Sequence, residues 1–219
     1  MKKVSPKLLL RLPSRGGKRL GAGRKPKGAA AGMPHRQRPA LAKRFPVHIT
    51  LRVQDRVWNL RSRRCFRHIA AAFKGVFGRR TFRLAEYAAL GNHLHLIVEA
   101  QDQRSLARGL QSLEIRIARG LNKLMGSSGP VFADRYHAHI LRTPTEVANA
   151  LRSVRGNFAV HAARRGEPVP EIADQSSCVL LNGGLPHEQE GPLVSAPETW
   201  LLGTGWKLLE ALCGARACY

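Results

Sequence analysis

The segment GNHLHLIVEA, residues 91–100, sets two histidines on either side of one leucine inside an apolar run. Side chains alternate between the two faces of a β-sheet, so His93 and His95 are expected to point one way and Leu94 the other. The leucines and valine that alternate with the histidines then face a core. We therefore predict a strand with one buried apolar face and a pair of imidazoles on its open face.

The surrounding sequence predicts further strands and helices in a β-α-β-β-α-β order. Period-two alternation indicates strands, and apolar residues spaced three and four apart indicate helices. The predicted elements are a strand at 47–53, a helix at 66–77, strands at 82–90 and 93–100 joined by a Gly91-Asn92 turn, a helix at 106–124 and a strand at 131–141. This order is that of the ferredoxin-like α+β sandwich, a mostly antiparallel sheet with helices on one face.

An extra C-terminal helix is predicted after these six elements. Thr143 suits its N-cap, Pro144 its first position, and Glu146 completes a capping box with Thr143. Apolar residues then recur at helical spacing from Val147 to Phe158. The fold class expected is therefore a ferredoxin-like sandwich with one added helix.

The charge of the chain predicts a polyanionic partner. There are 37 Lys and Arg residues against 14 Asp and Glu, a net charge of +23, which favours nucleic acid. Residues 1–44 hold 14 basic and no acidic residues, residues 46–166 hold 21 and 7, and residues 167–219 hold 2 and 7. We expect three parts: a basic, Gly/Pro-rich DNA-binding arm at 1–45, a folded domain at 46–166 and a C-terminal extension at 167–219.

The basic arm contains the segment GRKP, with Arg24, Lys25 and, two residues further on, Lys27. This segment resembles an AT-hook, whose arginine lies in the narrow minor groove of A/T-rich DNA. The alternative is an arm that binds phosphates without reading bases. Either way, Arg24, Lys25 and Lys27 are candidate DNA-binding residues.

The four cysteines show no repeated spacing, and the apolar run LLLRL at 8–12 is too short and basic for a secretory core or a membrane span. We therefore expect reduced thiols, no membrane association and a cytoplasmic, nucleoid-associated location.

Two imidazoles at positions i and i+2 on one sheet face can grip a divalent cation, although two ordinary core or surface histidines would give the same pattern. Three stretches favour the metal-binding interpretation over ordinary histidines: GNHLHLIVEA, VFADRYHAHILRTPTEVANALR and NFAVHAARRG. Together with RGGKRLGAGRKPKG and TWLLGTGW, they resemble the single-tyrosine HUH transposases, especially the REP-associated tyrosine transposases of bacteria. The resemblance covers most of the chain, with the matching stretches in the same order.

The resemblance implies an enzyme that nicks and rejoins hairpin-forming single-stranded DNA in transposition, as a monomer or homodimer. His93 and His95 would hold Mg²⁺ or Mn²⁺, which stabilises charge on the scissile phosphate. A tyrosine on the added helix would form a 5′-phosphotyrosine and free a 3′-hydroxyl. Asn157, one turn after the tyrosine position, would be the third metal ligand, with His161 as the alternative.

The chain departs from the family at the nucleophile. The family pattern ALxYVxxN is ALRSVRGN here, so Ser153 occupies the tyrosine position. A serine is shorter and less acidic than a phenol. Three alternatives follow: Ser153 is a weak nucleophile, Tyr136 replaces it, or the chain is a decayed or domesticated protein that binds DNA and metal without cleaving.

Other residues near Tyr136 are candidates for DNA contacts. His137 and His139 repeat the alternation of the first pair and would form either a second metal pair or a polar face near DNA. Arg135 and Arg142 flank them and suit phosphates. A non-catalytic DNA-binding protein on the same scaffold is the main alternative to a transposase, and an RNA-binding module is disfavoured because the central strands lack paired aromatic residues.

Overall fold

The computed structural model describes residues 38–164 and 193–214. Side chains are described as far as Arg155 in the first range and Ala211 in the second. The chain divides into two compact units, residues 1–34 and 35–219, and all described residues belong to the second.

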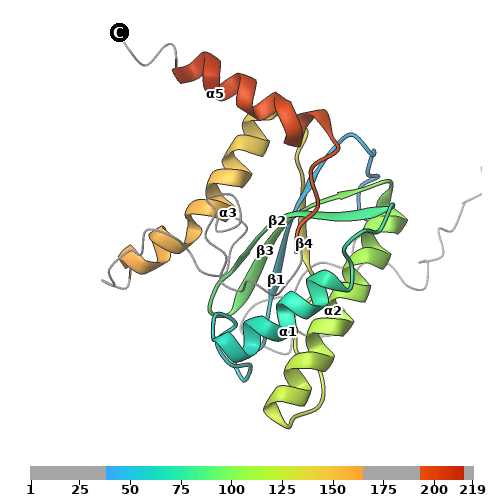
Figure 1. Ribbon diagram of the computed structural model, residues 1–219, viewed down its shortest axis with the longest axis vertical. Helices are drawn as coiled ribbons and strands as arrows, with labels where there is room; N and C mark the ends of the chain where they lie inside the picture. The colour runs from blue at the N-terminus through green and yellow to red at the C-terminus, as the bar shows by residue number, and fades with distance from the viewer. Residues whose placement is uncertain (1–37, 165–192, 215–219) are drawn as a thin grey trace, which may run out of the picture. The chain divides into compact units, whose positions relative to one another are not determined.

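A four-stranded antiparallel sheet forms the centre of this unit (Figure 1). Its strands are β1 (Val47–Arg52), β2 (Phe82–Ala89), β3 (His93–Ala100) and β4 (His137–Ile140), arranged in the order β2-β3-β1-β4. This order, with β1 and β3 in the centre, is that of the ferredoxin-like sandwich, so the predicted fold class is confirmed. The last strand is shorter than predicted, since only an isolated bridge between Val53 and Phe132 precedes it.

Helices α1 (Arg63–Lys74) and α2 (Gln103–Met125) cover one face of the sheet (Figure 1). Each begins at a capping side chain: Ser62 accepts a hydrogen bond from the backbone of Cys65, and Asp102 from that of Ser105. The second helix ends at Gly126, whose φ of 59° is the left-handed conformation that suits glycine.

The main core lies between this face and the two helices. Leu94, Leu96 and Val98 are fully buried there, as the alternation predicted. The same core takes apolar side chains from β1, α1 and α2, among them Ile49, Leu51, Ile69, Phe73, Leu110, Leu113 and Ile117. Leu41, before the first strand, is also buried in it.

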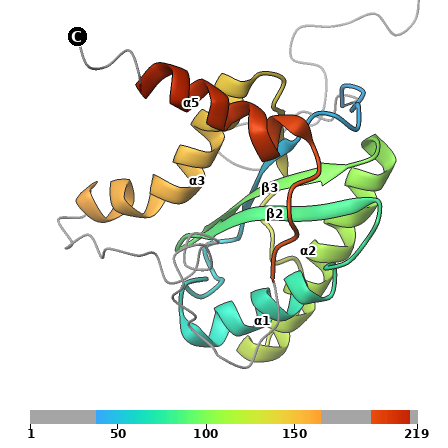
Figure 2. The same cartoon turned by 45° about the horizontal axis from the view of Figure 1, so that its top comes forward.

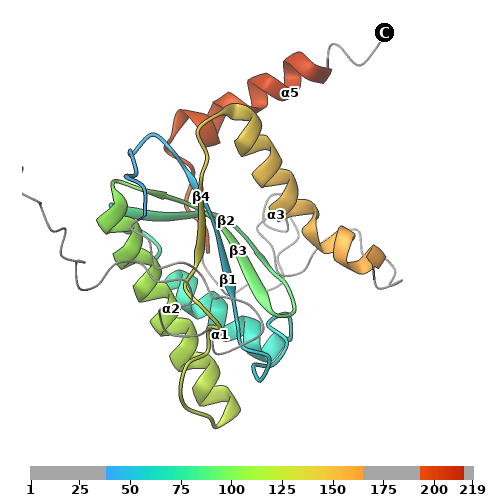
Figure 3. The same ribbon diagram turned by 180° about the vertical axis from the view of Figure 1, so that it is seen from behind.

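Helix α3 (Pro144–Arg164) packs on the opposite face of the sheet, against β2 and β3 (Figures 2 and 3). Its predicted capping box is present: the Thr143 hydroxyl accepts from the backbone N–H of Glu146 at 3.2 Å, and the Glu146 carboxylate from that of Thr143 at 3.3 Å. A π-helical turn, η1 (Leu201–Gly205), and α5 (Trp206–Gly214) pack beside it.

These elements form a second, smaller core. Ile97 lies fully buried beneath α3, with apolar residues of β2, α3 and η1 around it: Ala85, Ala88, Val147, Ala150, Leu151, Val154, Leu201 and Leu202. A bulge between Leu84 and Glu86 lets both Ala85 and Glu86 face this side of β2. The sheet is therefore buried on both faces where α3 crosses it.

The β2–β3 connection is the two-residue turn predicted at Gly91-Asn92, closed by a hydrogen bond from Leu90 N–H to His93 O of 2.9 Å. Neither turn residue has a positive φ, so this is not the primed turn usual for such loops. The turn carbonyls instead accept from Val53 and Leu60, both at 2.9 Å. The segment between β1 and α1 thus holds the turn.

Close packing between α2 and β2 predicts the effect of one substitution. A Cβ on Gly109 would lie 2.2 Å from two ring carbons of Phe82. We expect Gly109→Ala to lower the free energy of unfolding by about 1–2 kcal/mol, since overpacking costs more than alanine's helix propensity returns. Urea denaturation measures this. Gly203→Ala is the matched control, because its Cβ would meet no described atom within 4 Å other than those of neighbouring residues and the backbone of its own helix. A neutral Gly109→Ala would contradict the packing.

Candidate functional site

Five histidines share the face of the sheet opposite α1 and α2. Residues paired across an antiparallel sheet point to the same face. In the register, Thr50 pairs with both His95 and His137, His48 pairs with both Ile97 and His139, and Arg52 pairs with His93. The predicted orientation of His93 and His95 is therefore what the structure has, and His137 and His139 lie on the same face.

His48 is the histidine that the sequence analysis missed. Its ring nitrogen Nε2 lies 3.1 Å from Nδ1 of His95, and the two rings stack with centroids 5.2 Å apart. The alternation in VHITLRV places His48 on the face of the strand opposite to that of Val47 and Ile49. This signal was present in the sequence. The contact of His48 with His95 depended on the register, which the sequence did not reveal.

The geometry around His95 orders its ring. Besides His48, the hydroxyl of Thr50 lies 3.3 Å from Nδ1 of His95. The ring of His93 stands edge-on to that of His95, with centroids 4.9 Å apart, and Nδ1 of His93 lies 2.7 Å from Oδ1 of Asn92. Both residues are partly exposed, but Nε2 of His95 is buried.

Burial, together with the smaller effect of the neighbouring His139 and His137 imidazoles, lowers the pKa of His48 to about 4. His48 is therefore neutral at pH 7, and its ring carries one N–H. A neutral ring can accept a hydrogen bond at one nitrogen, which a protonated ring cannot.

The candidate metal ligands are the imidazoles of His93 and His95, whose ring centroids are 4.9 Å apart. The ring of His48 contacts that of His95. Among the described side chains, no group of three or more His, Cys, Asp or Glu is arranged to hold a metal ion. Asn157, the predicted third ligand, lies on α3 beyond the described side chains, as does His161. Of the three predicted ligands, the structure therefore describes the side chains of His93 and His95 alone.

Tyr136 lies on the other face of the sheet. Its ring packs against the main core, and the Arg38 guanidinium stacks on it, 3.5 Å from its centroid. Burial raises the pKa of the Tyr136 phenol, which Arg38 partly offsets. Attack by Tyr136 on a phosphate held at His93 and His95 is not supported by this position.

Tyr87 is on the same covered face. It is buried between α1 and the sheet, with its ring centroid 4.9 Å from that of Phe73, and burial raises the pKa of its phenol far above the usual 10. Tyr219 lies outside the described residues. No tyrosine among the described residues therefore shares a face with the histidine pair.

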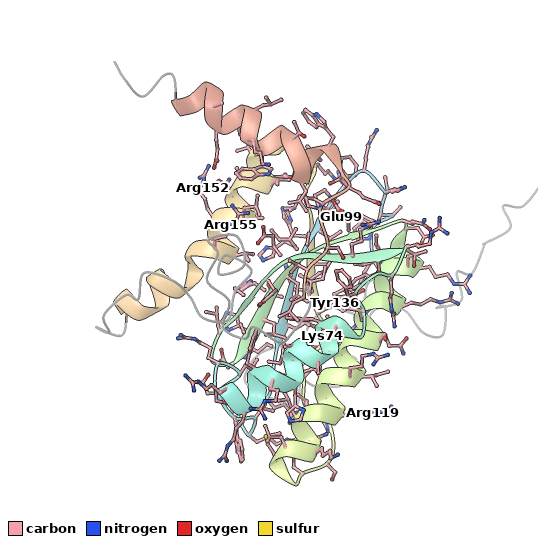
Figure 4. All side chains as sticks on the ribbon, in the orientation of Figure 1. Lys74, Glu99, Arg119, Tyr136, Arg152 and Arg155 are labelled. Atoms are coloured by element: carbon pink, nitrogen blue, oxygen red, sulfur yellow. The ribbon has the colours of Figure 1, made fainter. Side chains whose placement is uncertain are left out.

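Ser153 is exposed on α3, in a turn that is anchored to the sheet. The Arg155 guanidinium donates to the Glu86 carboxylate at 2.7 Å and lies over the Trp206 ring (Figure 4). Glu86 pairs with Ile97, and Ile97 is two residues along the strand from His95. The turn that carries Ser153 is thus tied to β2 by Arg155 and Glu86.

The predicted phosphate-binding residues are placed as follows. Arg135 and Arg142 are both exposed, one before β4 and the other between β4 and α3. Arg24, Lys25 and Lys27 lie outside the described residues. Across the described ranges, no helix is long and apolar enough to cross a membrane.

The surroundings of Tyr136 predict a pH-dependent substitution. Burial raises the pKa of Glu114 to about 6, although the positive charge of Arg38 opposes this. Because the folded state holds this proton more tightly than the unfolded state, stability falls as pH rises from about 4.5 to 6. We expect Glu114→Gln, which cannot ionise, to be more stable than the parent by roughly 1 kcal/mol at pH 7.5 and no more stable at pH 4.

Urea denaturation at the two pH values measures this difference, with Asp55→Asn, at an exposed carboxylate, as the control. An equal effect of Glu114→Gln at both pH values would show that the carboxyl is not desolvated.

A comparison with solved structures agrees with this architecture. No protein-family model and no curated protein matches the chain. Among solved structures, the chain is similar to a REP-associated tyrosine transposase bound to a REP hairpin, with a TM-score of 0.52 and 14% identity. The match covers 74% of this chain and 94% of that chain. The chain therefore has the fold of a REP-associated tyrosine transposase.

Proposed function

We propose that the chain binds hairpin-forming single-stranded DNA on the histidine-bearing face of its sheet, as a transposase does, but does not cleave it with its present sequence. The observation that carries this proposal is the position of the side chains. The imidazole pair faces the same side of the sheet as α3, while Tyr87 and Tyr136 lie on the other face. A serine stands where the family has its nucleophile.

The charge of the chain supports DNA as the partner. A net charge of +23 favours polyanions, and exposed Arg135 and Arg142 flank β4, beside the histidines. A solved structure with this fold is bound to a REP hairpin. Arg24, Lys25 and Lys27, in the basic arm, would add affinity by contacting phosphates or the minor groove.

We propose that His93 and His95 hold Mg²⁺ or Mn²⁺, with Asn157 as the third ligand. Nδ1 of His95 lies within hydrogen-bonding distance of His48 and Thr50, so Nε2 is the nitrogen with which His95 would bind. A His95 ring that donates from Nδ1 to a neutral His48 has the tautomer that this requires. Such a cation would polarise the scissile phosphate.

Strand cleavage and rejoining are the second candidate function. The exposed position of Ser153, on a turn held by the Arg155–Glu86 ion pair, favours it. In that reaction the hydroxyl oxygen of residue 153 attacks phosphorus, the bond to the 3′ oxygen breaks, and that oxygen leaves as a 3′-hydroxyl after taking a proton. A serine hydroxyl is a poorer nucleophile and leaving group than a phenol.

Covalent capture of DNA separates the two functions. We expect the purified chain, incubated with Mn²⁺ and a labelled hairpin oligonucleotide, to shift the hairpin in a native gel but to give no denaturation-resistant adduct. Ser153→Tyr should give the adduct, because it restores a phenol at the nucleophile position. Ser153→Phe is the matched control, equal in size without a hydroxyl. An adduct with the unchanged chain would establish cleavage, and absence of hairpin binding would overturn the proposal.

Cation binding can be tested without activity. We expect His95→Ala to abolish Mn²⁺ binding measured by isothermal titration calorimetry. We expect His48→Phe to weaken it by roughly 10–100-fold, as loss of a hydrogen-bonding partner of a metal ligand does. His68→Ala, on α1 at the far face, is the control. Unchanged Mn²⁺ affinity in His95→Ala would exclude this site.

A further inference from the structure

A cavity of about 520 Å³ opens at the end of the sheet away from the histidine pair. Its walls come from the segment before β1, from the start of β2, from the end of β3 and from the residues that lead into η1. Its volume is in the range of small-ligand sites. Its lining residues include Lys43, Arg44, Arg80, Arg83, Glu99 and Trp200.

The segment that leads into η1 is fixed to the sheet by Glu99 (Figure 4). The buried Glu99 carboxylate accepts hydrogen bonds from the backbone N–H of Glu198 at 2.8 Å and of Thr199 at 2.9 Å, and from the Thr199 hydroxyl at 2.7 Å. Glu198 in turn pairs with Arg83. Both carboxylates of the cavity are thus engaged in holding its wall.

The remaining charges of the cavity are positive. It is lined by four cationic side chains and two carboxylates, and Arg83 is matched by Glu198. Within the described residues, no ion pair involves Lys43, Arg44 or Arg80, and all three are exposed. This arrangement suits an anion, and a phosphodiester is the anion that the charge of the whole chain favours.

Trp200 gives the cavity an aromatic surface. Its side chain is 60% exposed, the most exposed of the large apolar side chains in the described residues. The ring lies against Gly205, where a Cβ would come within 2.7 Å of it, so the backbone of η1 holds one side of the ring. An exposed indole beside cations is the combination that binds single-stranded DNA, since bases stack on the ring while phosphates meet the charges.

The cavity and the histidine pair open on one face of the sheet. Glu99 points to the same face of β3 as Ile97, His95 and His93, and it pairs with Arg83 on β2. Six residues separate it from His93, which is about 20 Å at roughly 3.3 Å per residue. Ile97 lies between them on the strand and is buried beneath α3. The cavity is therefore distinct from the cation site, and DNA that contacts both must pass around α3.

We propose that this cavity binds a nucleotide of the single-stranded DNA that flanks the hairpin, with its base on Trp200 and its phosphate at Lys43, Arg44 and Arg80. This inference rests on the proposed function, because it assigns the flank of the same DNA. It predicts that a single-stranded tail adds affinity beyond that of the hairpin alone.

The test measures binding of the full chain to two probes by fluorescence anisotropy: a blunt hairpin, and the same hairpin with eight unpaired thymidines at each end. We expect Trp200→Ala to weaken binding of the tailed hairpin by roughly tenfold, the usual effect of losing one stacked base, and to leave the blunt hairpin unchanged. Trp200→Phe should retain most of the affinity. Trp58→Ala, which removes an indole that is 47% exposed outside the cavity, is the matched control.

The contribution of the basic side chains is measured separately, by the salt dependence of binding. We expect Arg80→Ala to reduce the salt dependence of tailed-hairpin binding by about one phosphate contact, whereas exposed Arg67→Ala on α1 should not. Equal affinity of Trp200→Ala and the parent for the tailed hairpin would overturn this inference while leaving hairpin binding intact. Failure of the parent to bind the blunt hairpin would instead overturn the proposed function.

Discussion

The antiparallel register between β1 and β3 is the constraint on which the rest of the structure depends. It pairs Thr50 with His95 and Ile49 with Leu96, so apolar side chains of both strands meet α1 and α2 while polar ones gather on the other face. A shift of one residue would turn every side chain of a strand to the opposite face. Burial of Ile49, Leu51, Leu94 and Leu96 therefore fixes the direction of the imidazoles as well.

The second face of the sheet has one part that packs against α3 and another that carries the histidines. Where α3 crosses β2 and β3, Ile97 and its neighbours are as buried as the residues of the main core. The histidines on this face are partly buried on β1 and β3 and exposed on β4. The ion pair of Arg155 with Glu86 sits at the boundary and ties the helix to the strand.

The tyrosines show why the identity of residue 153 matters for function. Tyr87 and Tyr136 fill apolar space beside the helices, and burial makes both phenols less acidic. Neither substitutes for a nucleophile on the histidine side. DNA binding makes different demands, since it depends on positive charge, stacking surfaces and shape, and the chain retains these. In the proposed function, DNA binding therefore does not depend on cleavage.

The sequence by itself determined the order of elements, the capping box of α3 and the face that His93 and His95 occupy, because these follow from local periodicity and from side chains a few residues apart. It could not determine that His48 lies 3.1 Å from His95, that Tyr136 lies under Arg38, or that residues 198–200 close a cavity over Glu99. Those contacts join residues between 47 and 100 positions apart. Only the strand register and the packing of α3 and η1 bring them together, and neither is encoded within any single segment.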